Sequence, residues 1–477
     1  MDYKRILNFI VIIAVAGIFY TSCAPKITQK TENKTVPTSY KDSQDTLNIA
    51  RNKWQEFFTD PYLRTLIDTA LKNNQELNIT LQEIVIARNE ARARKGDYLP
   101  MLNIGAGAGI FKEGRYTRFG AVDATTDIKP GTKMPDPLPN FTVGPNLSWE
   151  VDIWKKLRNS RKSAMLRYLA TTEGKNFMVT RLIAEIANSY FELMALDNQL
   201  EILRTNIKIQ QNALDIVRQL KNAAKVTELA VSRFEAEVAK NQSLLFYISQ
   251  QITETENNIN LLVGRFPQTV ARNSQTFPNL ISSAIHEGIP SQLLANRPDI
   301  RRAEQELTAA KLDVKIAKAN FYPGFRITAG MGFQAFNPKL LLEAPESILY
   351  YATGELVAPL INRNAIKALY YSANARQIQA VYNYERAILR AHIEVVNQLA
   401  NIQNLQSSYE LRSKQVDALT HSINISTALF QSARADYMEV LLTQRDALDS
   451  RFDLIETKKQ QMHAVVNVYQ ALGGGWY

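Results

Sequence analysis

The chain has 477 residues, 45% hydrophobic and 21% charged, with a mean hydropathy of −0.22, so its composition is in the range of globular proteins. A single cysteine excludes a disulfide framework and a thiolate metal site. The formal net charge of +10 comes from Lys and Arg scattered along predicted helices, which favours solvated helix faces over a nucleic-acid partner.

The first residues have the pattern of an export signal. Lys4 and Arg5 precede an apolar run, Ile6 to Phe19, that is short for a membrane-spanning helix. Cys23 then follows a small residue, as at the acylation site of a bacterial lipoprotein; the alternative is an incidental cysteine in a cleaved signal. We therefore expect three features: a lipoprotein signal peptide at 1–22, acylation of Cys23, and a polar, aperiodic tether at 23–53.

A helix is predicted to begin the folded part of the chain. Asp60 and Pro61 are a good N-cap and N1 pair, and apolar residues at helical spacing follow them. We expect the helix that begins near Trp54 to continue past Asn74 to about Lys95.

Strict alternation of apolar and polar residues predicts two strands after this helix, at about 99–111 and 141–153. Between them, residues 112–140 are rich in Gly, Pro and charge, and we expect a solvent-exposed loop. Two long amphipathic helices, 154–222 and 226–264, complete residues 54–264. At 1.5 Å per residue, the first would be on the order of 100 Å long, which no small globular core requires.

The second half repeats this order of elements. A proline-containing linker at 265–297 leads to residues 298–477, for which a helix, two strands and a helical hairpin are predicted. The strands are expected at about 324–336 and 348–361, and the long helices at about 364–430 and 435–472.

Several motifs recur at a constant spacing of 209 residues. Leu262-Val263-Gly264 corresponds in this way to Ala471-Leu472-Gly473, and Glu185 to Glu394. We interpret the chain as an internal duplication of two copies, 54–264 and 298–477, and not as a solenoid.

The four strands are each near the length that a tilted strand needs to cross a bilayer. An open four-stranded sheet leaves backbone groups unpaired in lipid, so the strands must close by oligomerisation. A dimer would give eight strands around side chains, whereas a trimer would give twelve around an aqueous lumen, which suits the long amphipathic helices better. The alternative is a soluble sheet packed on a helical bundle. The polar alternates expected to line the lumen are Thr142, Ser148, Glu150, Asp152, Arg326 and Gln334.

Several runs of sequence carry a family resemblance. The Leu293-Leu294…Arg297-Pro298-Asp299-Ile300 run and the Leu472-Gly473-Gly474-Gly475-Trp476 ending are specific in combination, and Tyr98-Leu99-Pro100, Ser148-Trp149-Glu150-Val151-Asp152 and Phe321-Tyr322-Pro323 support them. Nearly the whole mature chain resembles the outer-membrane factor family of TolC-type channels. The lipoprotein branch that serves resistance-nodulation-division (RND) efflux pumps is the most similar. Two positions depart from the family pattern: Ala223-Ala224 replaces glycine at the first hairpin tip, and Trp154-Lys155 replaces a Phe-Gly turn.

The resemblance implies a membrane α+β fold. Three chains, four strands each, would form a twelve-stranded outer-membrane β-barrel continued by a long periplasmic α-helical barrel. It also implies a periplasmic gate at the second hairpin tip, near 432–437, where we assign Asp436 with Arg434 as its possible pairing partner; an ordinary solvated Asp at a helix start is the alternative. The implied partners are a periplasmic membrane-fusion adaptor, an inner-membrane RND pump and outer-membrane lipid.

No enzyme signature occurs: G-x-S-x-G, P-loop and H-E-x-x-H motifs are all missing from the sequence. The four histidines have no metal-ligand spacing, so neither metal nor cofactor is expected. We therefore predict a passive exit duct for small molecules in a tripartite efflux system, anchored by lipid in the outer membrane. Two rivals remain, the outer channel of a type I protein-secretion system and a periplasmic helical scaffold lipoprotein.

Overall fold

Residues 24–40, 47–280, 286–361, 363–432 and 434–476 are described by a computed structural model of the chain. The predicted signal peptide and Cys23 lie outside these residues. The chain divides into two compact units, each drawing on both halves of the sequence. The first unit comprises Met1–Thr31, Ile86–Tyr168 and Gln305–Val381, and the second comprises Glu32–Val85, Leu169–Glu304 and Tyr382–Tyr477.

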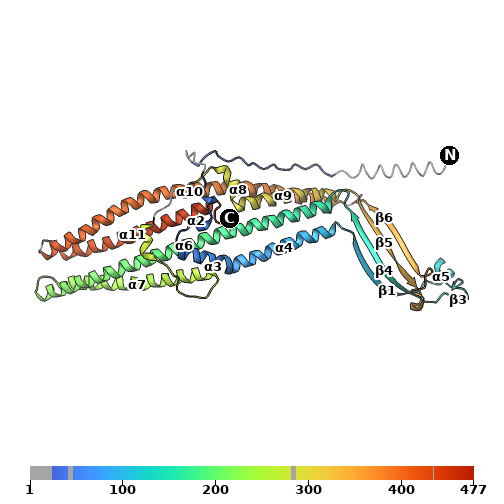
Figure 1. Cartoon of the computed structure of the whole chain (residues 1–477), viewed down its shortest axis with the longest axis horizontal. Coiled ribbons are helices and arrows are strands. Elements are labelled where there is room, and N and C mark those ends of the chain that lie inside the picture. Colours follow the sequence, from blue (N-terminus) through green and yellow to red (C-terminus); the bar gives the residue numbers. More distant parts are fainter. Residues whose placement is uncertain (1–23, 41–46, 281–285, 362, 433, 477) are drawn as a thin grey trace. The chain divides into compact units, whose positions relative to one another are not determined.

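The first unit holds a four-stranded antiparallel sheet (Figure 1). Its strands lie in the order β1 (Met101–Phe111), β4 (Leu138–Val151), β5 (Gly324–Ala335) and β6 (Ile348–Val357). Each strand begins and ends within four residues of its predicted bounds. Within the described chain, β1 and β6 have a partner strand on one side only, so both edges of the sheet carry unpaired backbone groups.

The segment predicted as a loop at 112–140 contains regular structure. A short helix, α5 (Arg118–Asp123), is followed by a two-stranded ribbon of β2 (Asp127–Lys129) and β3 (Thr132–Lys133). The Thr117 hydroxyl accepts a hydrogen bond from the Gly120 amide and caps α5. These elements are too short for a periodicity to show in the sequence.

The prediction of one continuous helix from Trp54 to about Lys95 is wrong. The structure has α2 (Trp54–Phe57), α3 (Pro61–Asn73) and α4 (Gln75–Asp97) in its place. Asp60 caps α3 as predicted, because its Oδ1 accepts from the amides of Tyr62 at 2.8 Å and Leu63 at 3.1 Å. Asn74 interrupts the helix in an extended conformation: its Oδ1 accepts from the Leu77 amide at 2.9 Å, and its Nδ2 donates to the Leu262 carbonyl at 2.8 Å.

Two long helical hairpins follow the strands (Figure 1). They are α6 (Lys156–Asn222) with α7 (Glu228–Val263), and α10 (Asn364–Gln431) with α11 (Tyr437–Ala471). The bounds of the second hairpin lie within one residue of those of the first when shifted by 209 residues. Among the described residues, no helix combines the length and the apolar composition needed to cross a membrane.

Apolar clusters hold these hairpins together in the second unit. Leu203 and Ile207 of α6 pack with Ile248 of α7 and Leu448 of α11. The remaining helices of the described chain are α8 (Leu293–Asn296), α9 (Pro298–Ala319), and the 3-10 helices Ile49–Arg51, Ser274–Asn279, Pro290–Gln292 and Pro338–Leu340.

The two departures from the family pattern have left-handed backbone conformations. Lys155 has φ 59° and Ala224 has φ 57°, and they are the non-glycine residues with positive φ in the described parts of the chain. Glycine adopts this conformation without the steric cost that a Cβ imposes. Lys155 and Ala224 therefore carry that steric cost in the turn before α6 and at the tip of the first hairpin.

The segment predicted as a tether is extended and held along α10. Residues 24–37 contain neither helix nor strand. In the first unit, Lys30 exchanges two hydrogen bonds with the Gln377 side chain. In the second unit, the Asn33 amide donates to Glu385 at 3.0 Å, and the Tyr40 ring stacks on His392 at 5.4 Å between centroids. We call residues 24–40 the strap.

Candidate functional site

The sheet of the first unit gathers the predicted polar residues on one face. Residues paired across antiparallel strands point to the same side of the sheet. Thr142 lies opposite Gln334, Ser148 opposite Thr328, and Glu150 opposite Arg326. The other face carries the apolar alternates, including Leu147 and Trp149 of β4 opposite Ala329 and Ile327 of β5. The predicted alternation of the faces is therefore present across β4 and β5.

The polar face has its own hydrogen bonds. Gln334 Nε2 donates to Asn140 Oδ1 at 2.8 Å, and the Tyr351 hydroxyl donates to Asn146 Oδ1 at 2.7 Å. Glu150 forms an ion pair with Lys156 at 3.2 Å, and both side chains remain more than a third exposed. The face is thus polar and mixed in charge.

Asp152 is a correction to the predicted lumen set. It lies beyond the end of β4, and its side chain is only 2% exposed. Its Oδ1 and Oδ2 accept from the amides of Leu157 and Arg158, each at 2.9 Å, so it satisfies free donors in the first turn of α6. A carboxylate buried in this way cannot line an aqueous lumen.

The predicted gate residues lie at the tip of the second hairpin in the second unit. Asp436 is the residue before α11, and its backbone carbonyl accepts from the Glu439 amide at 3.1 Å. Its side chain makes no capping hydrogen bond, and the side chains of Asp436 and Arg434 are both exposed. No ion pair joins Asp436 and Arg434 among the described residues of one chain, so a pairing between copies stays a prediction. The carboxylate is thus free to meet other groups.

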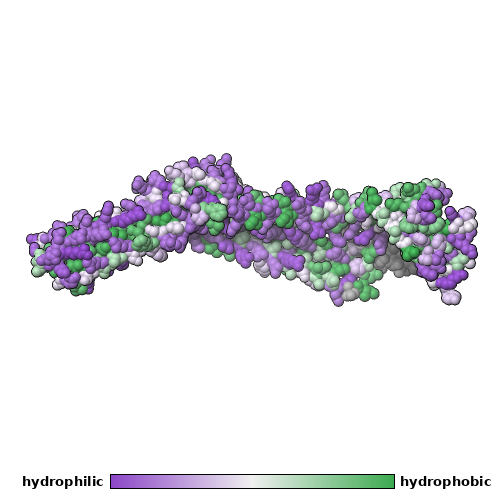
Figure 2. All heavy atoms as spheres, turned by 90° about the horizontal axis from the view of Figure 1, so that it is seen from below, coloured by the Kyte–Doolittle hydropathy of each residue, from purple (hydrophilic) through white to green (hydrophobic). Residues whose placement is uncertain are grey.

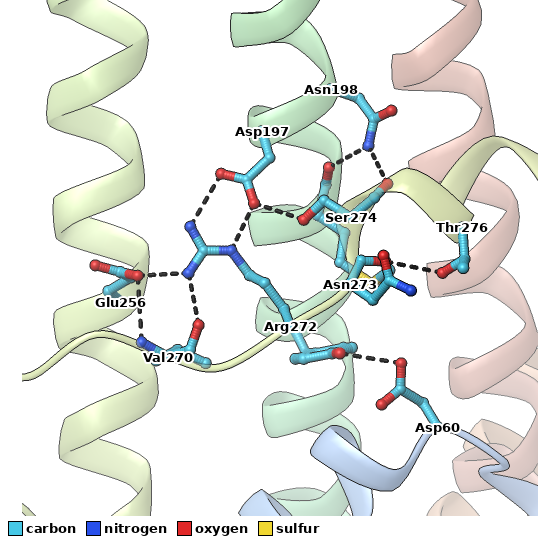
Figure 3. A network of polar contacts seen from close by, with 11 residues as sticks. Asp60, Asp197, Asn198, Glu256, Val270, Arg272, Asn273, Ser274 and Thr276 are labelled. Carbon is cyan, nitrogen blue, oxygen red and sulfur yellow. Dashed lines mark hydrogen bonds and ion pairs between the residues drawn. The ribbon is translucent and has the colours of Figure 1, made fainter.

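A polar network that the sequence did not predict joins α6, α7 and the linker in the second unit (Figure 3). Arg272 donates to Asp197 of α6 through Nε and Nη2, and to Glu256 of α7 through Nη1 at 2.5 Å. Burial opposes the charge of Arg272, but the two carboxylates outweigh it and raise the pKa of the guanidinium. Ser274 also donates to Asp197. The linker is therefore fixed to both helices of the first hairpin.

Arg297 is the centre of a second such network. It donates to Asp299 and to Glu394 Oε2, each at 2.7 Å, and to the Ala471 carbonyl at 2.9 Å, with only 6% of its side chain exposed. Burial opposes the charge of Arg297, but the two carboxylates outweigh it and raise the pKa of the guanidinium. The Arg-Pro-Asp motif marks this residue in the sequence, but its distant partners Glu394 and Ala471 are visible only in the fold.

No cluster of three or more His, Cys, Asp or Glu side chains suited to a metal ion occurs in the part of the chain that the structure describes. His392 stacks on Tyr40, and His463 Nε2 donates to the Asn188 carbonyl at 3.0 Å. Both histidines thus have packing partners and no carboxylate ligand set.

Comparison with known proteins agrees with this architecture. A model of the family described as outer membrane efflux protein matches residues 66–265 and 289–474. The chain is similar to the pyoverdine export outer membrane protein OpmQ of Pseudomonas aeruginosa, with 28% identity over 425 residues, 89% of this chain and 87% of OpmQ. It is also similar to the probable outer membrane lipoprotein SilC of Salmonella typhimurium, with 25% identity over 446 residues, 92% of this chain and 93% of SilC.

A solved structure has the same fold. The crystal structure of CusC, from work on conformational changes accompanying folding and transmembrane channel formation, superposes with a TM-score of 0.81. The sequence identity is 26%, and the match covers 95% of this chain and 99% of the CusC chain. The predicted family resemblance is thereby confirmed.

Proposed function

The chain belongs to the outer membrane efflux protein family, and we propose that three copies of it form the exit duct of a tripartite efflux machine. The duct performs no chemistry: it conducts small molecules passively from the periplasm to the exterior. The observation that carries this proposal is a four-stranded sheet with one apolar face, one polar face and two unpaired edges, β1 and β6.

Lipid requires that this sheet close on itself. Backbone groups cannot find hydrogen-bond partners in the hydrocarbon region, so β1 and β6 cannot remain edges there. Three copies joined from β6 to β1 give twelve strands, enough to surround water, whereas eight strands enclose a side-chain-filled interior. The apolar face then contacts lipid, and Thr142, Ser148, Glu150, Arg326 and Gln334 line the lumen.

The matching bounds of the two hairpins support a duplicated helical wall below the barrel. Figure 2 shows a largely hydrophilic surface on the visible face of the hairpins, with strips of hydrophobic residues among the hydrophilic ones. A wall that contacts water on one side and neighbouring helices on the other requires such a pattern. The hairpin tips are the parts that a membrane-fusion adaptor, linked to an inner-membrane RND pump, would grip.

Acylation of Cys23 would anchor the duct to the outer membrane. The export pattern before Cys23 and the extended strap after it support this anchor. Each CH₂ group that the acyl chains bury in the bilayer contributes about 0.8 kcal/mol to membrane binding, and the barrel adds a second attachment.

Asp436 is proposed to ring the closed periplasmic aperture. Three exposed carboxylates at one constriction attract cations and repel each other unless a cation or Arg434 of another copy pairs with them. The conductance of the purified channel in planar bilayers tests this. Asp436→Ala is expected to reduce cation selectivity and to raise resting conductance, and unchanged values for both would show that the gate lies elsewhere.

A deletion strain tests the efflux function. Loss of the gene is expected to raise susceptibility to small toxic compounds, and the wild-type gene should restore resistance. Defective secretion of a protein with unchanged susceptibility would favour a type I secretion channel instead. Failure of the purified protein to form pores would favour a scaffold.

A further inference from the structure

A cavity of about 630 Å³ in the second unit has an unusual lining of arginines. It lies between α6 and α10, over the start of α9 and the end of α11. Four guanidinium groups and only two carboxylates line it: Arg181, Arg297, Arg386, Arg390, Asp299 and Glu394. The lining groups therefore leave an excess of positive charge.

Arg297 forms the buried floor of this cavity. Its guanidinium is held by Asp299, Glu394 and the Ala471 carbonyl, as described above, and is almost fully buried. Both lining carboxylates are thus already engaged with the floor.

The wall on α10 supplies the uncompensated charge. Arg386 is exposed and donates to Asn383 Oδ1 at 3.0 Å, and it pairs with no carboxylate in the described chain. Arg390, one turn further, reaches Glu394 Oε1 at 2.9 Å, but its side chain stays 79% exposed, and Glu394 is shared with Arg297. Ion pairs this exposed are weak, so Arg390 remains available to a ligand.

Arg181 faces the same cavity from α6. Its contacts with Glu185 at 3.4 Å and with Glu76 at 3.3 Å are long and exposed, and neither carboxylate lines the cavity. Arg181 and Arg390 are 209 residues apart, and so are Glu185 and Glu394. A trimer would therefore carry six equivalent arginines at one level, together with three copies of Arg386.

The strap indicates which side of the wall the cavity opens on. In the second unit, Tyr384 and His392 of α10 contact the strap through Lys34 and Tyr40. At about 100° per residue, Arg386 and Arg390 lie on the opposite side of α10 from Tyr384 and His392. With Cys23 acylated as proposed, the strap that follows it runs outside the tube, and Arg386 and Arg390 therefore face the lumen.

We propose that this cavity is an anion-binding station inside the duct, and that small molecules bearing a carboxylate or phosphate group are among its transported substrates. The inference rests on the proposed channel function and on the proposed lipid anchor. Arg386, Arg390 and Arg181 supply planar donors that match the oxygens of such groups, and the buried Arg297 adds a fixed positive charge beneath them.

Binding of inorganic pyrophosphate to the purified trimer, measured by titration calorimetry, tests the station. We expect saturable binding to the wild type, and a dissociation constant about tenfold higher for Arg386→Gln, because one charge-assisted hydrogen bond is lost. Arg386→Lys should retain part of the affinity. Lys26→Gln removes the same charge from an exposed position on the strap and should change nothing. No saturable binding, or equal effects of Arg386→Gln and Lys26→Gln, would overturn the proposal.

Planar-bilayer recordings separate this inference from the function on which it rests. The chloride-to-potassium permeability ratio should fall severalfold in the Arg386→Gln, Arg390→Gln double variant. A wild-type protein without pores refutes the channel itself. A wild-type pore whose permeability ratio is unaffected by the double variant refutes the station alone.

Discussion

The Tyr351 hydroxyl reaches over Gly330 to donate a hydrogen bond to Asn146 Oδ1 at 2.7 Å. Gly330 of β5 lies opposite Asn146 of β4 and Tyr351 of β6, so the contact joins three strands on the polar face. A Cβ at position 330 would lie 2.6 Å from both Asn146 Oδ1 and Tyr351 Cε1. The glycine is therefore required by the side chains that cross it.

Gly330→Ala is expected to destabilise the sheet by about 1–3 kcal/mol, because the added methyl group must displace both partners. Thermal unfolding of the detergent-solubilised protein measures this. Gly324→Ala, in the same strand, is the matched control because a Cβ there meets nothing within 4 Å. Equal melting temperatures for the two variants would contradict the crossing contact.

The left-handed tip residue predicts a stabilising substitution. Ala224→Gly should raise stability by about 0.5–1 kcal/mol. Glycine removes the steric cost of a Cβ at φ 57°, and this gain exceeds the cost of the greater chain entropy that glycine has in the unfolded state. Ala223→Gly should have the opposite sign, because the Ala223 amide still donates to Gln219 in the helical pattern. Denaturant midpoints of both variants decide the question, and a destabilised Ala224→Gly protein would refute the account of the tip.

Neighbouring carboxylates on β4 and at its end are expected to behave differently. Glu150→Gln should shift the cation-to-anion permeability of the channel, because Glu150 lies on the polar face opposite Arg326. Asp152→Asn should leave permeability unchanged and lower stability by about 0.5–2 kcal/mol, because a helix-capping contact is weakened. Reversal potentials and melting temperatures of both variants distinguish the roles, and a permeability shift in Asp152→Asn would restore Asp152 to the lumen.

A pH dependence follows from His463 between α11 and α6. Desolvation lowers its pKa, against the hydrogen bond to Asn188 and the nearby Glu192 and Glu456, while Lys459 lowers it further. The unfolded state therefore takes up a proton near pH 6.5, before the folded state does. The stability linked to this group is complete above about pH 6.5 and is lost as the pH falls from there toward the folded pKa.

His463→Gln should remove this part of the acid sensitivity. Melting temperatures of wild type and variant should run parallel above about pH 7 and converge or cross as the pH falls below about 6.5. Glu192, Glu456 and Lys459 are present in both proteins, so their contributions cancel in the difference. A constant difference at all pH values would show that His463 does not titrate in this range.

Periodicity alone predicted the elements that are long. The four strands, the paired hairpins and their tips follow from alternation and from helical spacing, and the N-cap at Asp60 follows from one dipeptide. Side chains that bond across the fold were not predictable. In the sequence, Asn74 is typical of a helix interior, and only the structure shows its contact with Leu262. Arg272 is likewise typical of a linker, and only the structure shows that Asp197 and Glu256 lie beside it.

Asp152 shows the limit of the pattern most clearly. In the sequence the alternation continues through Asp152, but the strand ends at Val151. The free amides in the first turn of α6 donate hydrogen bonds to the Asp152 carboxylate. Period-two reasoning predicts a face only while the strand lasts.

Disulfide trapping between the sheet edges tests the trimeric duct most directly. Ala352→Cys on β6 is combined in turn with Leu102→Cys, Ile104→Cys or Ala106→Cys on β1, positions that share the apolar face. Two strands separate these sites within one chain, so a disulfide can form only between copies. The account predicts that oxidation of outer membranes links chains up to a three-chain product and no further for at least one pair. Products that stop at two chains, or monomers alone for every pair, would contradict it.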